Sequence, residues 1–149
     1  MKSKLLHESA GQRTYAIVLA AGDDVISSLK QFATDAGLSA ASITAIGAFR
    51  RAELGYFDWE TKEYRPIPVN EQVEVASLIG DIAIGPDGKS ALHIHVVLGK
   101  RDGSAVAGHL VKAEVRPTLE VILTESPQHL RKRHDPESGL ALIALDSAS

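Results

Sequence analysis

The hydrophobic period of the chain changes after Leu38, and this change limits the fold more than any other feature. From Asp24 to Ala36, apolar residues recur at intervals of three and four, which predicts an amphipathic helix. Asp23 is expected to cap its start, and Gly37 stands where a glycine commonly ends a helix. After Leu38, short apolar and β-branched runs alternate with turn sequences, which predicts strands. One helix and many strands favour an α+β domain.

Turn sequences separate the expected strands, and the pattern indicates an antiparallel or mixed sheet. Pro66 and Pro68 are expected to end one strand at a sheet edge, and the turn at 85–88 is expected to join two strands as a hairpin. We expect about seven strands in this sheet and one main helix, an α+β (α/β) architecture. These strands are expected among nine candidate segments: 15–21, 42–49, 52–58, 63–67, 72–84, 91–98, 106–111, 118–124 and 140–145.

The length of 149 residues suits a single domain, with a core at about 14–124 and a C-terminal extension at 125–149. No run of about 18 apolar residues occurs, so we expect no membrane span. Polar residues interrupt the N-terminal apolar stretch before a secretion signal can form, which favours a cytoplasmic location. The chain has no cysteine, so a metal would have to be bound by histidine or carboxylate.

The net charge of −3 disfavours binding to DNA, because nonspecific DNA affinity depends on a continuous basic surface. Basic residues do cluster at three places, namely Arg50-Arg51, Lys100-Arg101 and the run 131–134. Such runs usually lie in solvated loops. DNA therefore remains a disfavoured partner.

Three histidines form the strongest candidate site. His93 and His95 are two apart in an expected strand, so both side chains point to one face, about 6.6–6.8 Å apart along the strand. A hairpin centred near Arg101 would place His109 opposite His93, whereas a shift of one residue would send it to the other face. Three imidazoles are typical zinc ligands and also suit other divalent transition metals. The alternative is that all three are ordinary surface residues.

Several carboxylates lie near expected strands and are candidates for a base or for a contact that orients a histidine. The spacing does not choose among them: Glu53, Glu74, Asp81, Glu114 and Glu120. His7, His129 and His134 have no such partners in the sequence and are expected on the surface. The sequence has no nucleophile elbow, phosphate-binding loop or dinucleotide fingerprint.

Several motifs together resemble the PPC (plant and prokaryote conserved) domain. They are the segments 46–49 (IGAF), 52–57 (AELGYF), 74–83 (EVASLIGDIA), 92–99 (LHIHVVLG), 102–103 (DG), 108–110 (GHL) and 117–121 (PTLEV). The resemblance extends from about Thr14 to Thr124. It implies a mainly antiparallel sheet packed on a helix, and a homotrimer. Plant relatives carry a DNA-binding hook that this chain lacks, whereas prokaryotic members look like carriers of a metal site.

We therefore predict a stand-alone trimeric PPC-domain protein with a three-histidine metal site, with zinc or another divalent transition metal at His93, His95 and His109. A small anionic ligand is expected at the open metal position. Two other hypotheses remain: a DNA-associated or regulatory protein, and a metal-dependent hydrolase or lyase that acts on a small anionic substrate. No catalytic residue is assigned.

Overall fold

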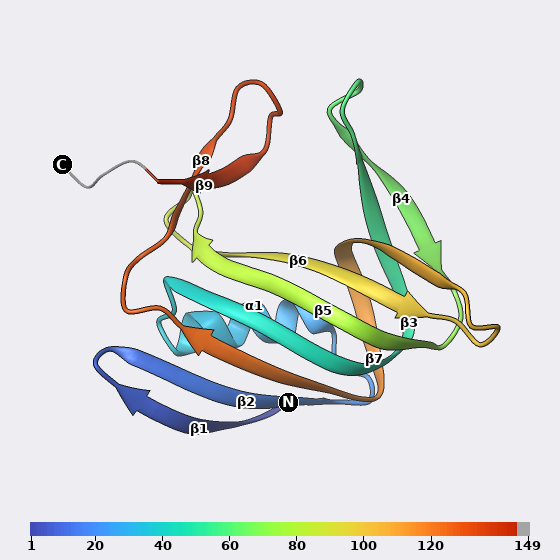
Figure 1. The fold of residues 1–149 in the computed structure, drawn as a ribbon, viewed down its shortest axis with the longest axis horizontal. Helices are drawn as coiled ribbons and strands as arrows, with labels where there is room; N and C mark the ends of the chain where they lie inside the picture. Colours follow the sequence, from blue (N-terminus) through green and yellow to red (C-terminus); the bar gives the residue numbers. More distant parts are fainter. Residues whose placement is uncertain (146–149) are drawn as a thin grey trace.

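The computed structural model describes residues 1–145 and has one nine-stranded sheet in this part of the chain, with a single helix against it (Figure 1). The expected α+β class is confirmed. In chain order the elements are β1 (Lys2–Ser9), β2 (Gln12–Ala20), α1 (Val25–Asp35), β3 (Ala40–Asp58), β4 (Glu63–Val69), β5 (Val73–Ile84), β6 (Ser90–Gly99), β7 (Ala105–Glu125), β8 (Arg131–His134) and β9 (Ala141–Ala144). The last four residues of the expected C-terminal extension lie outside the described residues.

Strands β1 and β8 were not expected from the sequence. All residues of β1 are exposed, and β8 is the basic run Arg131–His134, so neither has the apolar alternation that marks a strand. Strand β1 extends the sheet by pairing with β2, and β8 pairs with β9. Strand β1 lies at one end of the strand order, and β8 lies between β5 and β9 at the other.

Helix α1 begins one residue later than expected and has a different cap. Asp24, not Asp23, is the N-cap, because its carboxylate accepts a hydrogen bond from the backbone amide of Ser27 at 2.9 Å. Asp23 instead accepts a hydrogen bond from the amide of Ala20. Gly37 has a φ of 64° just after the helix, as a C-terminal glycine should. The buried side of α1 consists of Val25, Leu29, Phe32 and Ala33.

Two pairs of expected strands are in fact two long strands. Strand β3 joins the segments 42–49 and 52–58, and β7 joins 106–111 and 118–124. Bulges between Gly47 and Arg51 shift the β3–β7 register, so the polar residues between the apolar runs bend the ladder without ending it. At Gly47, with a φ of 150°, a Cβ would lie 2.3 Å from the carbonyl oxygen of Thr118, so this position requires glycine.

The central strands form a closed circuit of pairings. Strand β3 pairs with β5 and β7, and β6 pairs with the same two strands. The hairpin expected at 85–88 joins β5 to β6. The circuit therefore fixes the position of β6 from both sides, and β6 carries two of the candidate histidines.

Two hairpins project from the same side of this circuit (Figure 1). One consists of the end of β3 with β4, and the other of β8 with β9. Pro66 and Pro68 lie inside β4 rather than at its end, which an edge strand tolerates because one row of its amides has no ladder partner. The second hairpin is joined to the sheet where Ile84 pairs with Arg131.

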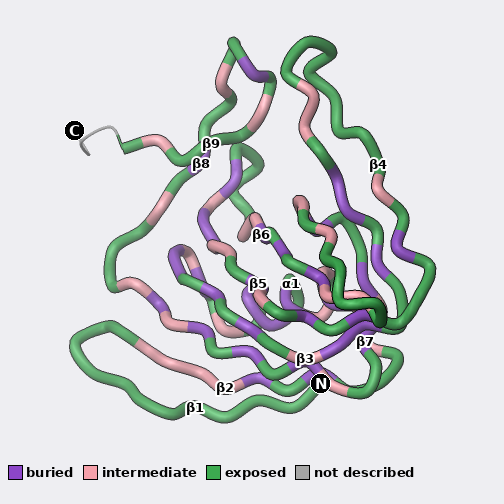
Figure 2. Tube along the Cα trace, turned by 45° about the vertical axis from the view of Figure 1, so that its right-hand side comes forward, coloured by how far each residue is buried: buried purple, intermediate pink, exposed green. Residues whose placement is uncertain are grey.

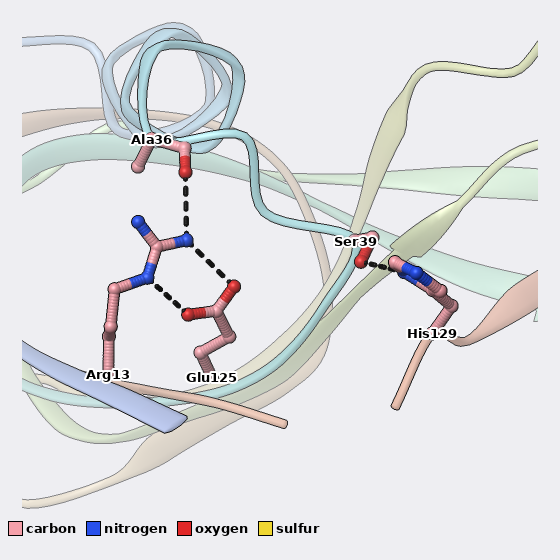
Figure 3. Close-up of polar contacts among 5 residues, drawn as sticks. All are labelled: Arg13, Ala36, Ser39, Glu125 and His129. Atoms are coloured by element: carbon pink, nitrogen blue, oxygen red, sulfur yellow. Dashed lines mark hydrogen bonds and ion pairs between the residues drawn. The ribbon is translucent and has the colours of Figure 1, made fainter. Parts of the chain in front are cut away.

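Polar contacts fix α1 and the segment before β8 to the sheet (Figure 3). The Arg13 guanidinium on β2 donates hydrogen bonds to both carboxylate oxygens of Glu125 on β7 and to the carbonyl oxygen of Ala36, at the end of α1. Ser39 Oγ forms a hydrogen bond with His129 Nδ1. These contacts join segments that are far apart in the sequence.

The alternation of buried and exposed residues along the strands divides the sheet into two faces (Figure 2). Buried residues such as Leu19, Leu119 and Ile94 lie on the side that packs on α1. The other side, here called the outer face, exposes Val18, Ile46, Ile79 and Ile122. The single helix of the described residues, α1, is not long and apolar enough to cross a membrane.

Candidate metal centre

The structure brings His93, His95 and His109, here called the histidine triad, together on the outer face. His93 and His95 are alternate residues of β6, so they point to the same side of the sheet. His109 on β7 lies directly opposite His95. The expectation that His109 pairs with His93 is therefore wrong. The observed register differs from it by two residues, and a shift of two keeps every side chain on its face.

The spacing of the triad fits a metal ion. One nitrogen of each ring can be chosen so that all three lie within 4.8 Å of one another. The Nε2 atoms of His93 and His95 are 3.2 Å apart. Two nitrogens that each lie about 2.0–2.1 Å from a tetrahedral zinc ion are about 3.3 Å apart, so this pair already has the separation that an ion requires.

The electrostatics of the triad keep two of its rings neutral. Burial lowers the pKa of His109 to about 4, and repulsion by His93, His95 and Lys132 adds to this effect. Burial, and then the neighbouring His93, also lower the pKa of His95. A neutral imidazole has a free lone pair, which is the form that binds metals. Moreover, the buried Nδ1 of His109 has no hydrogen-bond partner among the described residues, and a metal ion would satisfy such an atom.

The structure selects one of the five candidate carboxylates. Asp81 on β5 pairs with His93 across the two strands, and its Oδ2 lies 3.3 Å from His93 Nδ1. Its other oxygen lies 2.9 Å from Lys132 Nζ on β8. A carboxylate at Nδ1 holds the ring so that Nε2 points into the triad. The side chain of Lys132 is only 6% exposed, so this residue of the expected basic loop faces inward.

The remaining candidates lie elsewhere. Glu114 forms ion pairs with Arg50 and Arg51, both at 3.0 Å. Glu53 lies with Glu114 beside a separate cavity, and Glu74 and Glu120 lie beside another. The three histidines outside the triad are exposed, as expected: His7, His129 and His134. The sequence could not single out Asp81 among the five candidates, because its contact with His93 depends on the β5–β6 register.

A cavity of about 410 Å³ lies beside the triad, between the two projecting hairpins. His93, His109 and Lys132 form its polar end, and Tyr64 of β4 stacks on His109 with 5.0 Å between ring centroids. The remainder of the lining is mostly apolar and comes from β6 and the end of the chain: Ala91, Leu92, Leu140, Ala141, Leu142 and Ile143. A small molecule in this cavity would lie next to any ion bound by the triad.

Comparisons with known proteins agree with this fold. The chain is 34% identical to a plant- and prokaryote-conserved (PPC) protein of Pyrococcus horikoshii, with 91% of this chain and 94% of that chain covered and a TM-score of 0.84. It is also 34% identical to a metal-containing protein of Archaeoglobus fulgidus, with coverages of 97% and 99% and a TM-score of 0.83. A Ralstonia eutropha protein, provisionally described as DNA-binding, is 32% identical over 89% of this chain and 91% of its own, with a TM-score of 0.82.

Comparison with curated proteins finds no match. Residues 6–127 match the family described as the Plants and Prokaryotes Conserved (PCC) domain. This match includes the whole histidine triad and Asp81, and it ends just after β7. The chain therefore belongs to the plants and prokaryotes conserved domain family, as the sequence motifs predicted.

Proposed function

We propose that this PCC-domain chain binds one divalent transition metal ion, zinc above all, at His93, His95 and His109. The convergence of three imidazole nitrogens within 4.8 Å on a closed circuit of strands carries the proposal. Because the backbone positions these rings, the site needs little rearrangement to bind an ion. The metal-containing relative from Archaeoglobus fulgidus supports it.

Three neutral imidazoles would leave at least one position of the ion open. A zinc ion bound there would act as a Lewis acid toward a small molecule at that position. We propose binding rather than a reaction, because Asp81, which contacts His93, is already engaged by Lys132 and is poorly placed to take up a proton from a substrate.

Elemental analysis tests the metal site. Untagged protein dialysed against zinc and then against metal-free buffer should contain about one zinc per chain, and His95→Ala should lose most of it while keeping its circular dichroism spectrum. His134→Ala is the matched control, since His134 is an exposed histidine on β8 outside the triad. A zinc content near zero in the wild type, or one unchanged by His95→Ala, would exclude the proposed site.

We also propose a homotrimer. The exposed apolar residues of the outer face, Val18, Ile46, Ile79 and Ile122, provide a surface that a second copy would bury. Of the apolar residues in 119–123, only Ile122 is exposed, because Leu119, Val121 and Leu123 are buried within the chain. Association through the outer face would bring copies together beside the triad.

DNA binding is the second candidate function, because a relative is provisionally described as DNA-binding. The ion pairs of this chain weigh against it. Arg50 and Arg51 contact Glu114, Lys100 contacts Glu71, and Lys132 contacts Asp81. Each of these cations is already partnered by a carboxylate, so the basic runs do not form a continuous positive surface for phosphates.

A further inference from the structure

The charges around the triad identify the kind of ligand that the neighbouring cavity would bind. This inference rests on the proposed metal site. The three imidazoles would contribute no negative charge to offset a divalent ion. Among the described residues, Asp81 is the carboxylate in contact with a triad histidine, and Lys132 lies 2.9 Å from it. The opposite charges of Asp81 and Lys132 cancel, so the full charge of the ion would remain for a ligand to balance.

The walls of the cavity have a different character from its polar end. Ile143 pairs with Lys132 across the β8–β9 hairpin, so both side chains lie on the same face of this hairpin. Lys132 points inward to Asp81, and Ile143 therefore also faces the cavity, where it is 41% exposed. Ala91 on β6 points to the same side of its strand as His93. An apolar wall thus lies within reach of the open metal position.

We propose that this cavity binds a small-molecule carboxylate with a short apolar chain. Its carboxylate would take the open metal position, and its chain would lie against Ile143 and Ala91. The cavity volume of about 410 Å³ is at the small end of the range of about 300–1,000 Å³ for ligand pockets, which favours a small ligand. The β8–β9 hairpin is then a wall of the binding site as well as an extension of the sheet.

Calorimetric titration of zinc-loaded protein with acetate, butyrate and hexanoate tests this proposal. Each buried methylene strengthens binding about fourfold, equivalent to about 0.8 kcal/mol, so hexanoate should bind at least about tenfold more tightly than acetate. Hexylamine, which has the same chain and the opposite charge, should bind at least about tenfold more weakly than hexanoate. Ile143→Glu should bring hexanoate to within about threefold of acetate, whereas Leu145→Glu, at an exposed position outside the cavity lining, should preserve the difference.

Methyl NMR locates the ligand independently of affinity. Hexanoate should shift the δ1-methyl resonance of Ile143 and leave that of Ile46 on the outer face unchanged. Equal affinities for acetate and hexanoate in zinc-loaded wild type, or an unshifted Ile143, would overturn this proposal and leave the metal site intact. A protein that binds no zinc in elemental analysis would overturn both.

Discussion

Asp81 and His93 face each other across β5 and β6, with 3.3 Å between the carboxylate Oδ2 and the imidazole Nδ1. Lys132 Nζ lies beside the other carboxylate oxygen of Asp81. A residue on β8 therefore helps to orient the imidazole of His93 on β6. Contacts of this kind fix the tautomer and direction of a metal-binding histidine. The metal affinity of the triad should therefore depend on residues that do not bind the metal.

We expect Asp81→Asn to weaken zinc binding by about 10- to 100-fold. An uncharged amide forms a weaker hydrogen bond to the His93 imidazole than a carboxylate does, and it does not make the ring a stronger ligand. Lys132→Met should weaken it less, since Asp81 would remain in contact with His93. Competition with a chromophoric chelator measures both effects. Glu8→Gln is the matched control, at an exposed strand carboxylate on β1, away from the triad. Unchanged affinity in Asp81→Asn would show that Asp81 does not position His93.

The lowered pKa values of His109 and His95 predict how the stability of the metal-free protein depends on pH. Histidines in the unfolded chain take up protons near pH 6.5, whereas His109 in the folded chain does so only near 4. Between about pH 6.5 and 4 the unfolded chain binds more protons than the folded chain. Acidification therefore lowers the free energy of the unfolded state relative to that of the folded state. This contribution to stability is fully present above about pH 6.5 and is lost as the pH falls toward about 4.

Urea unfolding in the presence of a chelator, measured across this pH range, tests that dependence. The His109→Leu variant should show a smaller loss of unfolding free energy on acidification than the wild type. His7→Leu, at an exposed histidine on β1, should show the same loss as the wild type. If the two variants behave alike, burial of His109 does not contribute to the pH dependence.

The proposed trimer should have three times the chain mass of 15.9 kDa in light scattering at micromolar concentration. The double variant Ile46→Asp, Ile122→Asp should dissociate, because two charges would lie in the apolar centre of the interface. Leu145→Asp, at a position that is 84% exposed, should remain trimeric. A wild-type mass of one chain would contradict the trimer.

We expect little DNA affinity at physiological salt, because most basic clusters are paired with carboxylates. Fluorescence anisotropy with a short labelled duplex measures it. Glu114→Gln would release Arg50 and Arg51 from their ion pairs and should increase retention at low salt. Micromolar or tighter binding by the wild type near physiological salt, lost in Arg131→Ala, would instead support a DNA-associated role.

The triad illustrates what a sequence predicts about a site and what it does not. The period of two in a strand placed His93 and His95 on one face, and a register error of two residues did not change the face of His109. In contrast, nothing near Asp81 or Lys132 in the sequence indicates their contact, since it depends on a register and on a hairpin about 50 residues away. The breaks expected in β3 and β7 were absent for a related reason: bulges let a strand continue past residues that do not suit it.

The exact facing of His95 and His109 also has a consequence for protein engineering. The pair owes its position to the β6–β7 ladder rather than to a specialised loop. Val97 and Ala107 form an equivalent outward-facing pair, two residues after His95 on β6 and two residues before His109 on β7. Both are exposed. Histidines introduced at these two positions would repeat the same arrangement with His95 as their shared neighbour. The scaffold thus offers a regular grid on which ligand sites can be moved in steps of two residues.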